Sequence, residues 1–249
     1  MSGHSKWSTI KRKKGAIDAK KGKIFTKLIK EISIAVKEGG SGEPDSNPRL
    51  RLAIQNAKGS NMPKDNIERA IKKAAGADAD SYEEVNYEGY AQHGVAVFVE
   101  CMTDNLNRTV SSIRAAFNKY GGNLGTKGSL EFIFDHKGIF TFQLPEGKDQ
   151  DDLILEIIDA GAEDVEIDEG YITVTTAMED FGNLNKKIEE LDIETESAEL
   201  QRIPKTTVSL DDDAFMKVMK FIDALEDNDD VQKVYHNIDM KESQFELVN

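Results

Sequence analysis

Residues 95–103, VAVFVECMT, and 104–122, DNLNRTVSSIRAAFNKYGG, decide the fold class of this chain. The first segment is rich in β-branched residues, and their alternation predicts a strand. In the second, Thr103 or Asp104 can cap a helix that Gly121 ends. The apolar residues between them recur at the spacing of one helix face: Leu106, Val110, Ile113, Phe117 and Tyr120. A strand followed directly by a helix indicates a mixed α and β protein.

Outward from this pair, strands are expected at 85–90 and 129–134. A second series then begins with strand 138–144, helix 151–160, strand 163–168, strand 171–176, helix 179–191 and strand 193–202. This β-α-β-β-α-β order predicts a ferredoxin-like arrangement.

The C-terminal part reads as half of such a unit. Its expected elements are a strand near 205–208, a helix capped within 211–213 and a strand at 231–238. The half-unit that ends near 134 also lacks a complement. We therefore predict one discontinuous domain, 82–135 plus 204–249, with a ferredoxin-like domain, 137–203, inserted in it.

The first 76 residues change from irregular sequence to a helical pattern. Residues 1–15 have no periodicity and read as an extended arm, whereas an apolar stripe from Ala16 to Gly39 predicts a long helix. Asn47-Pro48 and Pro63 open two further helices, and Gly76 ends the last. The predicted fold class is α+β: an N-terminal three-helix domain, 1–76, followed by two ferredoxin-like α+β domains, one inserted in the other.

Charge is distributed very unevenly along the chain, which has a net charge of −14. Up to Gly76 there are 18 Lys/Arg and 7 Asp/Glu, whereas the remainder has 14 and 39. Clustered cations repel one another within a Debye length of about 8 Å at physiological salt. Binding to a polyanion removes this repulsion and releases the counterions condensed on the polyanion. The basic end therefore predicts a nucleic-acid-binding region.

The candidate contact residues are the cations of the arm and first two helices and the single tryptophan. Trp7 can anchor the arm or stack on an unpaired base, and anchoring is the more common role for such a residue. The lysines of the first helix are expected on its exposed face. The candidates are Lys6, Trp7, Lys11, Arg12, Lys13, Lys14, Lys20, Lys21, Lys23, Lys27, Lys30, Arg49 and Arg51.

The sequence lacks the patterns of catalytic and metal sites. The four histidines lie on unrelated segments, and Cys101, the one cysteine, is expected as a buried, inert thiol. The loop 121–128 fails the phosphate-loop pattern and runs from helix to strand, so it reads as a helix cap with tight turns. We expect no enzyme activity, no cofactor and no metal.

The composition also bears on location and assembly. No apolar run approaches the roughly 20 residues that span a bilayer, and the first thirty residues lack the apolar core of a signal peptide. We therefore expect a cytoplasmic protein with no membrane partner. No heptad pattern predicts a dimer, and a monomer is expected.

Several motifs together resemble the YebC/PmpR family. They begin with Gly3-His4-Ser5-Lys6-Trp7 and continue in order over almost the whole chain, with Ser2 where the family often has Ala. The others are 23–27 (KIFTK), 47–51 (NPRLR), 61–63 (NMP), 87–90 (YEGY), 104–109 (DNLNRT), 121–125 (GGNLG), 161–164 (GAED), 225–227 (LED) and 229–232 (DDVQ).

The resemblance implies a three-domain α+β protein without enzyme activity or cofactor. Members are usually described as DNA-binding transcriptional regulators. A related interpretation makes them translation factors that relieve ribosomes stalled at sequences such as proline runs, and mitochondrial relatives activate translation. The partner is therefore nucleic acid, either DNA or the rRNA and tRNA of the ribosome. A nucleic-acid-processing enzyme is the weakest alternative, because no acid–base or metal set is visible.

Overall fold

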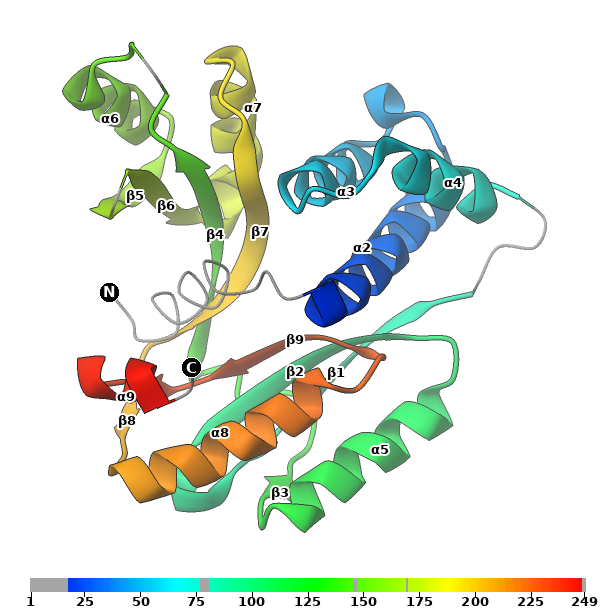
Figure 1. Ribbon diagram of the computed structural model, residues 1–249, viewed down its shortest axis with the longest axis vertical. Coiled ribbons are helices and arrows are strands. Elements are labelled where there is room, and N and C mark those ends of the chain that lie inside the picture. Colours follow the sequence, from blue (N-terminus) through cyan, green and yellow to red (C-terminus); the bar gives the residue numbers. More distant parts are fainter. Residues whose placement is uncertain (1–17, 77–80, 146, 169, 248–249) are drawn as a thin grey trace. The chain divides into compact units, whose positions relative to one another are not determined.

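The computed structural model describes residues 18–76, 81–145, 147–168 and 170–247 (Figure 1). It combines helices with two four-stranded sheets, so the predicted α+β fold class is confirmed. Two compact units can be distinguished. Among the described residues, unit 1 contains 18–30, 81–135 and 203–247, and unit 2 contains 31–76 and 136–202.

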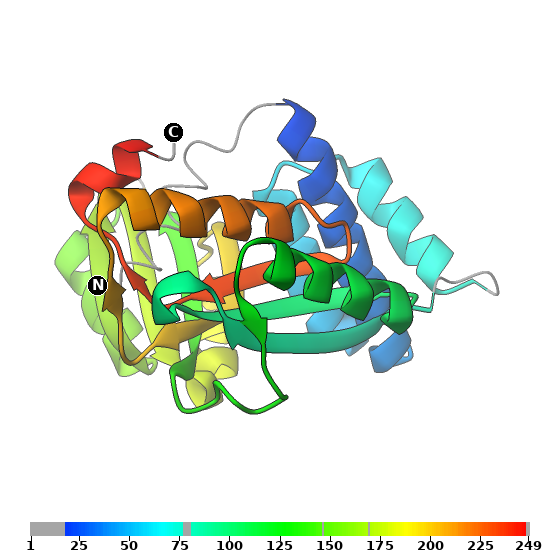
Figure 2. The ribbon, with the colours of Figure 1, turned by 90° about the horizontal axis from the view of Figure 1, so that it is seen from below.

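Unit 1 is built on an antiparallel sheet with the strand order β3-β1-β2-β9. Its strands are β1 (Glu83–Tyr90), β2 (Ala96–Thr103), β3 (Asn123–Leu124) and β9 (Val231–His236). Helices α5 (Leu106–Lys119) and α8 (Asp212–Glu226) cover one face of this sheet, and both lie in front of it in Figure 2. The core beneath them includes Val97 and Val99 of β2, which alternate with residues that face the other side of the sheet.

Shorter elements complete unit 1. They are η2 (Gln92–Gly94), the parallel pair β8 (Val208–Ser209) and β10 (Ile238–Asp239), and α9 (Glu242–Leu247). The two aromatic rings Phe117 of α5 and Phe221 of α8 meet edge to face, with centroids 4.9 Å apart. This contact joins the two helices over the sheet.

Unit 2 contains a second sheet with the order β5-β6-β4-β7. Its strands are β4 (Phe134–Gln143), β5 (Ala162–Asp168), β6 (Tyr171–Ala177) and β7 (Thr195–Pro204). The connecting helices are α6 (Gln150–Asp159), η3 (Met178–Asp180) and α7 (Phe181–Glu190). Phe140 and Phe142 of β4 pack in one core with Leu153 of α6 and Leu184 of α7. The chain order and strand order are those of a ferredoxin-like sheet.

The N-terminal helices are α2 (Asp18–Gly39), α3 (Pro48–Gly59) and α4 (Lys64–Ala74), with η1 (Pro44–Ser46) between the first two. The predicted cap Asn47 is confirmed, since its side-chain oxygen accepts the N–H of Leu50 at 3.0 Å. The amide of Asn47 also donates to the carbonyl of Ala35 at 2.7 Å, which ties the start of α3 to α2.

Helix α3 is fixed to the edge of the second sheet. The side chain of Asn56 donates to the carbonyl of Ala198 at 2.9 Å and accepts the N–H of the same residue at 2.8 Å. One amide thus pairs with the backbone of β7 as a neighbouring strand would. Gly59 lies so close to Glu196 that a Cβ at Gly59 would fall 2.1 Å from the Glu196 carbonyl oxygen.

Three local predictions were wrong. The strand predicted at 129–134 does not form: 127–133 form turns, and strand β4 begins only at Phe134. The 1–4 spacing of Leu130 and Ile133 reflects a turn closed by a 2.9 Å hydrogen bond. The N-cap of α5 is Asn105, which accepts the N–H of Arg108, rather than Thr103 or Asp104. Around 205–208 the only strand in the described chain is Val208–Ser209.

The residue limits predicted for the three domains, 1–76, 82–135 plus 204–249, and 137–203, stay a prediction. Helix α2 contributes its residues up to Lys30 to unit 1 and those from Glu31 to unit 2.

Candidate nucleic-acid interface

Part of the predicted interface lies outside the described residues. This holds for Lys6, Trp7, Lys11, Arg12, Lys13 and Lys14. Lys20 and Lys21 belong to α2, but their side chains are outside the described part. The structure therefore bears directly on five of the predicted residues: Lys23, Lys27, Lys30, Arg49 and Arg51.

Lys23, Lys27 and Lys30 form one stripe along α2, because their spacing of four and three residues returns to the same helix face. This lysine stripe meets an acidic turn of unit 1, residues 226–232, between α8 and β9. The ammonium of Lys23 lies 2.7 Å from the Asp227 carboxylate, and that of Lys27 donates to the carbonyls of Glu226 and Gln232. Lys23 and Lys27 thus have partners within the same chain.

Lys30 is the most enclosed member of the stripe. Its side chain and that of Asp230 are each 7% exposed, and the two charged groups are 3.2 Å apart. The ammonium also donates to the carbonyls of Asp229 at 2.7 Å and Met102 at 3.1 Å. The prediction of an exposed Lys30 is therefore wrong: its three N–H groups are used inside unit 1, and we remove it from the interface.

Asp230 gathers donors from three residues on two helices. Besides Lys30, it accepts N–H groups of Arg108 at 2.9 and 3.1 Å and the hydroxyl of Thr109 at 2.9 Å. Arg108 reaches Asp104 as well, at 2.7 Å. Two of the motifs noted in the sequence, at 104–109 and 229–232, thus meet around a single buried carboxylate.

The electrostatics of this cluster follow from its geometry. Burial by itself raises the pKa of Asp230, but the hydrogen bonds from Arg108, Thr109 and Lys30 outweigh it and hold the pKa below its ordinary value. The hydrogen bond to Asp230 is the main cause that raises the pKa of Arg108. The carboxylate is therefore ionised at neutral pH, and it anchors α2 and α5.

The two predicted arginines of α3 differ from each other. Arg49 forms an ion pair with Glu38 of α2, so its charge is already compensated. Arg51 is exposed, and its side chain has no ion-pair partner among the described residues. Only Arg51 of this pair is available to an external anion.

Three further cations, which are not in the predicted contact set, share the situation of Arg51. They are Lys58 of α3 and Arg69 and Lys72 of α4, all exposed and without an ion-pair partner in the described ranges. Helix α4 also carries acidic residues that can pair with its cations, Asp65 and Glu68. The observed pair is Lys64 with Glu68, one turn apart at 3.5 Å, which leaves Arg69 and Lys72 unpaired within the described chain.

The glycine-rich loop after α5 has a structural role. Glu88, which is 3% exposed, accepts the N–H groups of Gly128 and Leu130, both at 2.7 Å. Gly121 has a φ of +70°, as expected for a residue that ends a helix. A Cβ on Gly89 would lie 2.6 Å from the Phe117 ring. The predicted cap with tight turns is confirmed, and the motif at 87–90 supports it.

The described residues also bear on three other kinds of feature: a reactive thiol, a metal site and a membrane-spanning helix. Cys101 is buried, and burial raises the pKa of its thiol to about 12, so it is protonated and unreactive at neutral pH. Within 18–76, 81–145, 147–168 and 170–247, His, Cys, Asp and Glu side chains form no group that could ligate a metal. In the same ranges no helix combines the length and apolar character of a membrane span.

Comparisons with known proteins agree along the chain. Residues 5–77 match the model of the TACO1/YebC protein N-terminal domain, and residues 82–238 match the model of the TACO1/YebC second and third domain. The crystal structure of a conserved hypothetical protein from Aquifex aeolicus has a TM-score of 0.79 and 43% identity, covering 90% of this chain and 93% of that one.

Curated relatives are similarly close. A protein of Amoebophilus asiaticus is 57% identical over 240 residues, covering 96% of this chain and 98% of its own. One of Geotalea uraniireducens is 54% identical over 247 residues, with 99% of both chains covered. Each is named "Probable transcriptional regulatory protein". The resemblance seen in the motifs is confirmed, and this chain belongs to the TACO1/YebC family.

Proposed function

We propose that this protein is a non-enzymatic regulator of gene expression that binds nucleic acid through its basic N-terminal region. The observation that supports this most is the charge separation, 18 Lys/Arg against 7 Asp/Glu up to Gly76 and 14 against 39 beyond it. The acidic remainder is repelled by phosphate, so it orients binding toward the basic end.

The proposed contact set combines predicted residues whose side chains lie outside the described part with exposed cations inside it. It comprises the arm residues Lys6, Trp7 and Lys11 to Lys14, the early α2 residues Lys20 and Lys21, and Arg51. Lys58, Arg69 and Lys72 join it because they are exposed and uncompensated within the described chain. Lys23 and Lys27 contribute less, since a phosphate would have to replace the partners that they have in the acidic turn.

Duplex DNA is the first candidate partner. The names of the curated relatives support it, because transcriptional regulators commonly act on DNA. Helices α3 and α4 are joined by a four-residue connection, 60–63, which resembles the spacing of a helix-turn-helix unit.

One observation favours a second candidate, RNA on the ribosome. A recognition helix reads bases with its N-terminal residues. The first turns of α4, however, carry the carboxylates of Asp65 and Glu68, which the DNA phosphates repel. Helix α3 is unavailable for the same role, since Asn56 is paired with β7. A basic arm with an aromatic residue suits shaped or single-stranded RNA.

The two candidates are separated by binding of the full chain. A DNA-binding regulator binds a specific duplex far more tightly than random duplex, typically by a factor of about 10³ or more. A translation factor instead co-sediments with ribosomes, most strongly when stalling is induced at proline runs. Failure to bind either DNA or ribosomes would refute the proposed function.

A further inference from the structure

The acidic part of the chain contains one long segment without any carboxylate. Between Asp104 and Glu131 there are 26 residues and no Asp or Glu, although the chain beyond Gly76 has 39 of them. The segment includes Arg108, Arg114, Lys119 and Lys127 and forms α5 with the glycine-rich loop that follows. A basic segment inside an acidic unit needs an explanation of its own.

The structure explains Arg108 fully and Lys119 in part, but it does not explain Arg114. Arg108 neutralises Asp104 and Asp230. Arg114 and Lys119 are exposed, and neither has a carboxylate partner among the described residues. Lys119 lies in the last turn of α5, where a cation interacts favourably with the negative end of the helix dipole. Its ammonium also lies 5.3 Å from the centre of the Tyr120 ring. Arg114 lies mid-helix and has no such role.

The exposed side of α5 also carries short polar groups, together with the apolar side chain of Leu106 at its first turn. Asn107, Ser111 and Asn118 are exposed at the spacing of one helix face with Arg114. We define these three with Arg114 and Lys119 as the α5 surface. In Figure 2 this helix lies in front of the sheet of unit 1. The side-chain amides of Asn107 and Asn118 beside two cations match the usual donors to phosphate oxygens.

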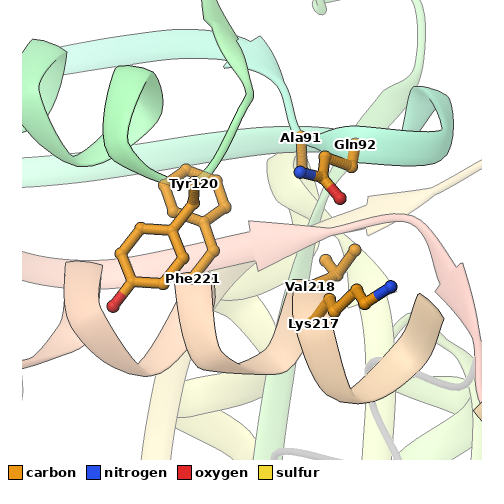
Figure 3. A pocket seen from close by; sticks show the side chains of 6 residues that line it. All are labelled: Ala91, Gln92, Tyr120, Lys217, Val218 and Phe221. Atoms are coloured by element: carbon orange, nitrogen blue, oxygen red, sulfur yellow. The ribbon is translucent and has the colours of Figure 1, made fainter. Parts of the chain in front are cut away.

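A third cation adjoins the C-terminal end of α5. Lys217 of α8 lines a small hollow with Tyr120, Phe221 and Gln92 (Figure 3). The hollow has almost no interior volume, far below the roughly 300 Å³ of typical small-molecule pockets. Lys217 is exposed and, within the described ranges, has no ion-pair partner. These cations therefore fit an extended polyanion better than an enclosed small ligand.

The chemistry favours nucleic acid over an acidic protein. Protein interfaces depend on apolar and aromatic anchors at their centre, whereas the large exposed apolar side chain of α5, Leu106, lies at the start of the helix, eight positions before Arg114. We propose that the α5 surface, with Lys217, is a second contact for the phosphate backbone of the nucleic acid that the N-terminal region binds. This inference rests on the proposed function and adds a second point of attachment, on the acidic unit.

The test compares two double variants of the full chain. Arg114→Gln with Lys217→Gln removes two cations from the proposed surface, and neither has a described partner whose loss would disturb folding. Lys186→Gln with Lys241→Gln removes the same charge elsewhere. Affinity for a mixed-sequence duplex DNA and for a structured RNA hairpin is measured over a salt series, with circular dichroism melting as the control for folding.

We expect the slope of log K against log salt on duplex DNA to flatten by up to about 0.9 for each phosphate that the variant no longer neutralises. The Arg114/Lys217 variant should neutralise up to two fewer phosphates on at least one probe, and the Lys186/Lys241 variant the same number as wild type. Equal slopes for wild type and the Arg114/Lys217 variant would overturn the inference, as would equal flattening in both variants. Failure of the wild type to bind either probe would instead refute the proposed function.

Discussion

The lysine stripe of α2 and the cations of α5 look alike in the sequence but differ in the structure. Both are groups of basic residues on a single helix. Lys23, Lys27 and Lys30 meet an acidic turn that lies about 200 positions away in the chain. Arg114 and Lys119 meet no carboxylate in the described chain. A local excess of charge therefore does not reveal whether its partner is internal or external.

The largest effect is expected at the centre of the stripe. Asp230→Ala leaves Lys30 and Arg108 without their shared carboxylate, and loss of one partner of a buried pair costs about 3–5 kcal/mol. Urea unfolding of wild type and variant gives the change in the free energy of unfolding. Asp227→Ala is the matched control, since its pair with Lys23 is exposed and should contribute far less. Equal costs for the two variants would show that burial does not distinguish these pairs.

The second effect is a dependence on pH. Because the pKa of Asp230 is lowered in the folded protein, this carboxylate stabilises the fold above its unfolded pKa of about 3.9. That contribution is lost as pH falls from there through the lower, folded pKa. Urea unfolding at a series of pH values should show the stability difference between wild type and Asp230→Asn shrink over this acidic range. A constant difference would contradict the assignment.

The smallest effect on stability is expected on α5. Arg114→Gln removes an exposed side chain without a described partner, so the free energy of unfolding should change by no more than about 0.5 kcal/mol. The same urea series used for Asp230→Ala measures it. A loss of several kcal/mol would mean that Arg114 has a structural partner, and the contrast between the two helices would disappear.

Local signals explain what the sequence could predict. Asn47 was recognisable as a cap because the interaction spans three residues, and the two-residue and 3.6-residue periods located β2, α5 and most of unit 2. The strand prediction for 129–134 was wrong because the positions of Leu130, Ile133 and Phe134 are compatible with either a strand or a turn. Their burial beside Phe98 and Tyr235 depends on tertiary contacts.

The internal role of Lys30 could not be predicted from its surroundings. Asp230 lies in another element, and only the fold brings the two together. The motifs at 104–109 and 229–232 were visible as separate features, but nothing in their spacing indicated that they meet. The same limit applies to Arg69 and Lys72, whose availability depends on which acids the helices place beside them.

The central claim is that the basic N-terminal region provides most of the affinity for nucleic acid. Its most direct test is the salt dependence of binding for wild type and for the combined variant Lys11→Gln, Arg12→Gln, Lys13→Gln and Lys14→Gln. The slope of log K against log salt on duplex DNA should flatten by up to about 0.9 for each phosphate that is no longer neutralised, and more than in Arg51→Gln. An unchanged slope in the four-residue variant, with wild-type binding intact, would contradict the account.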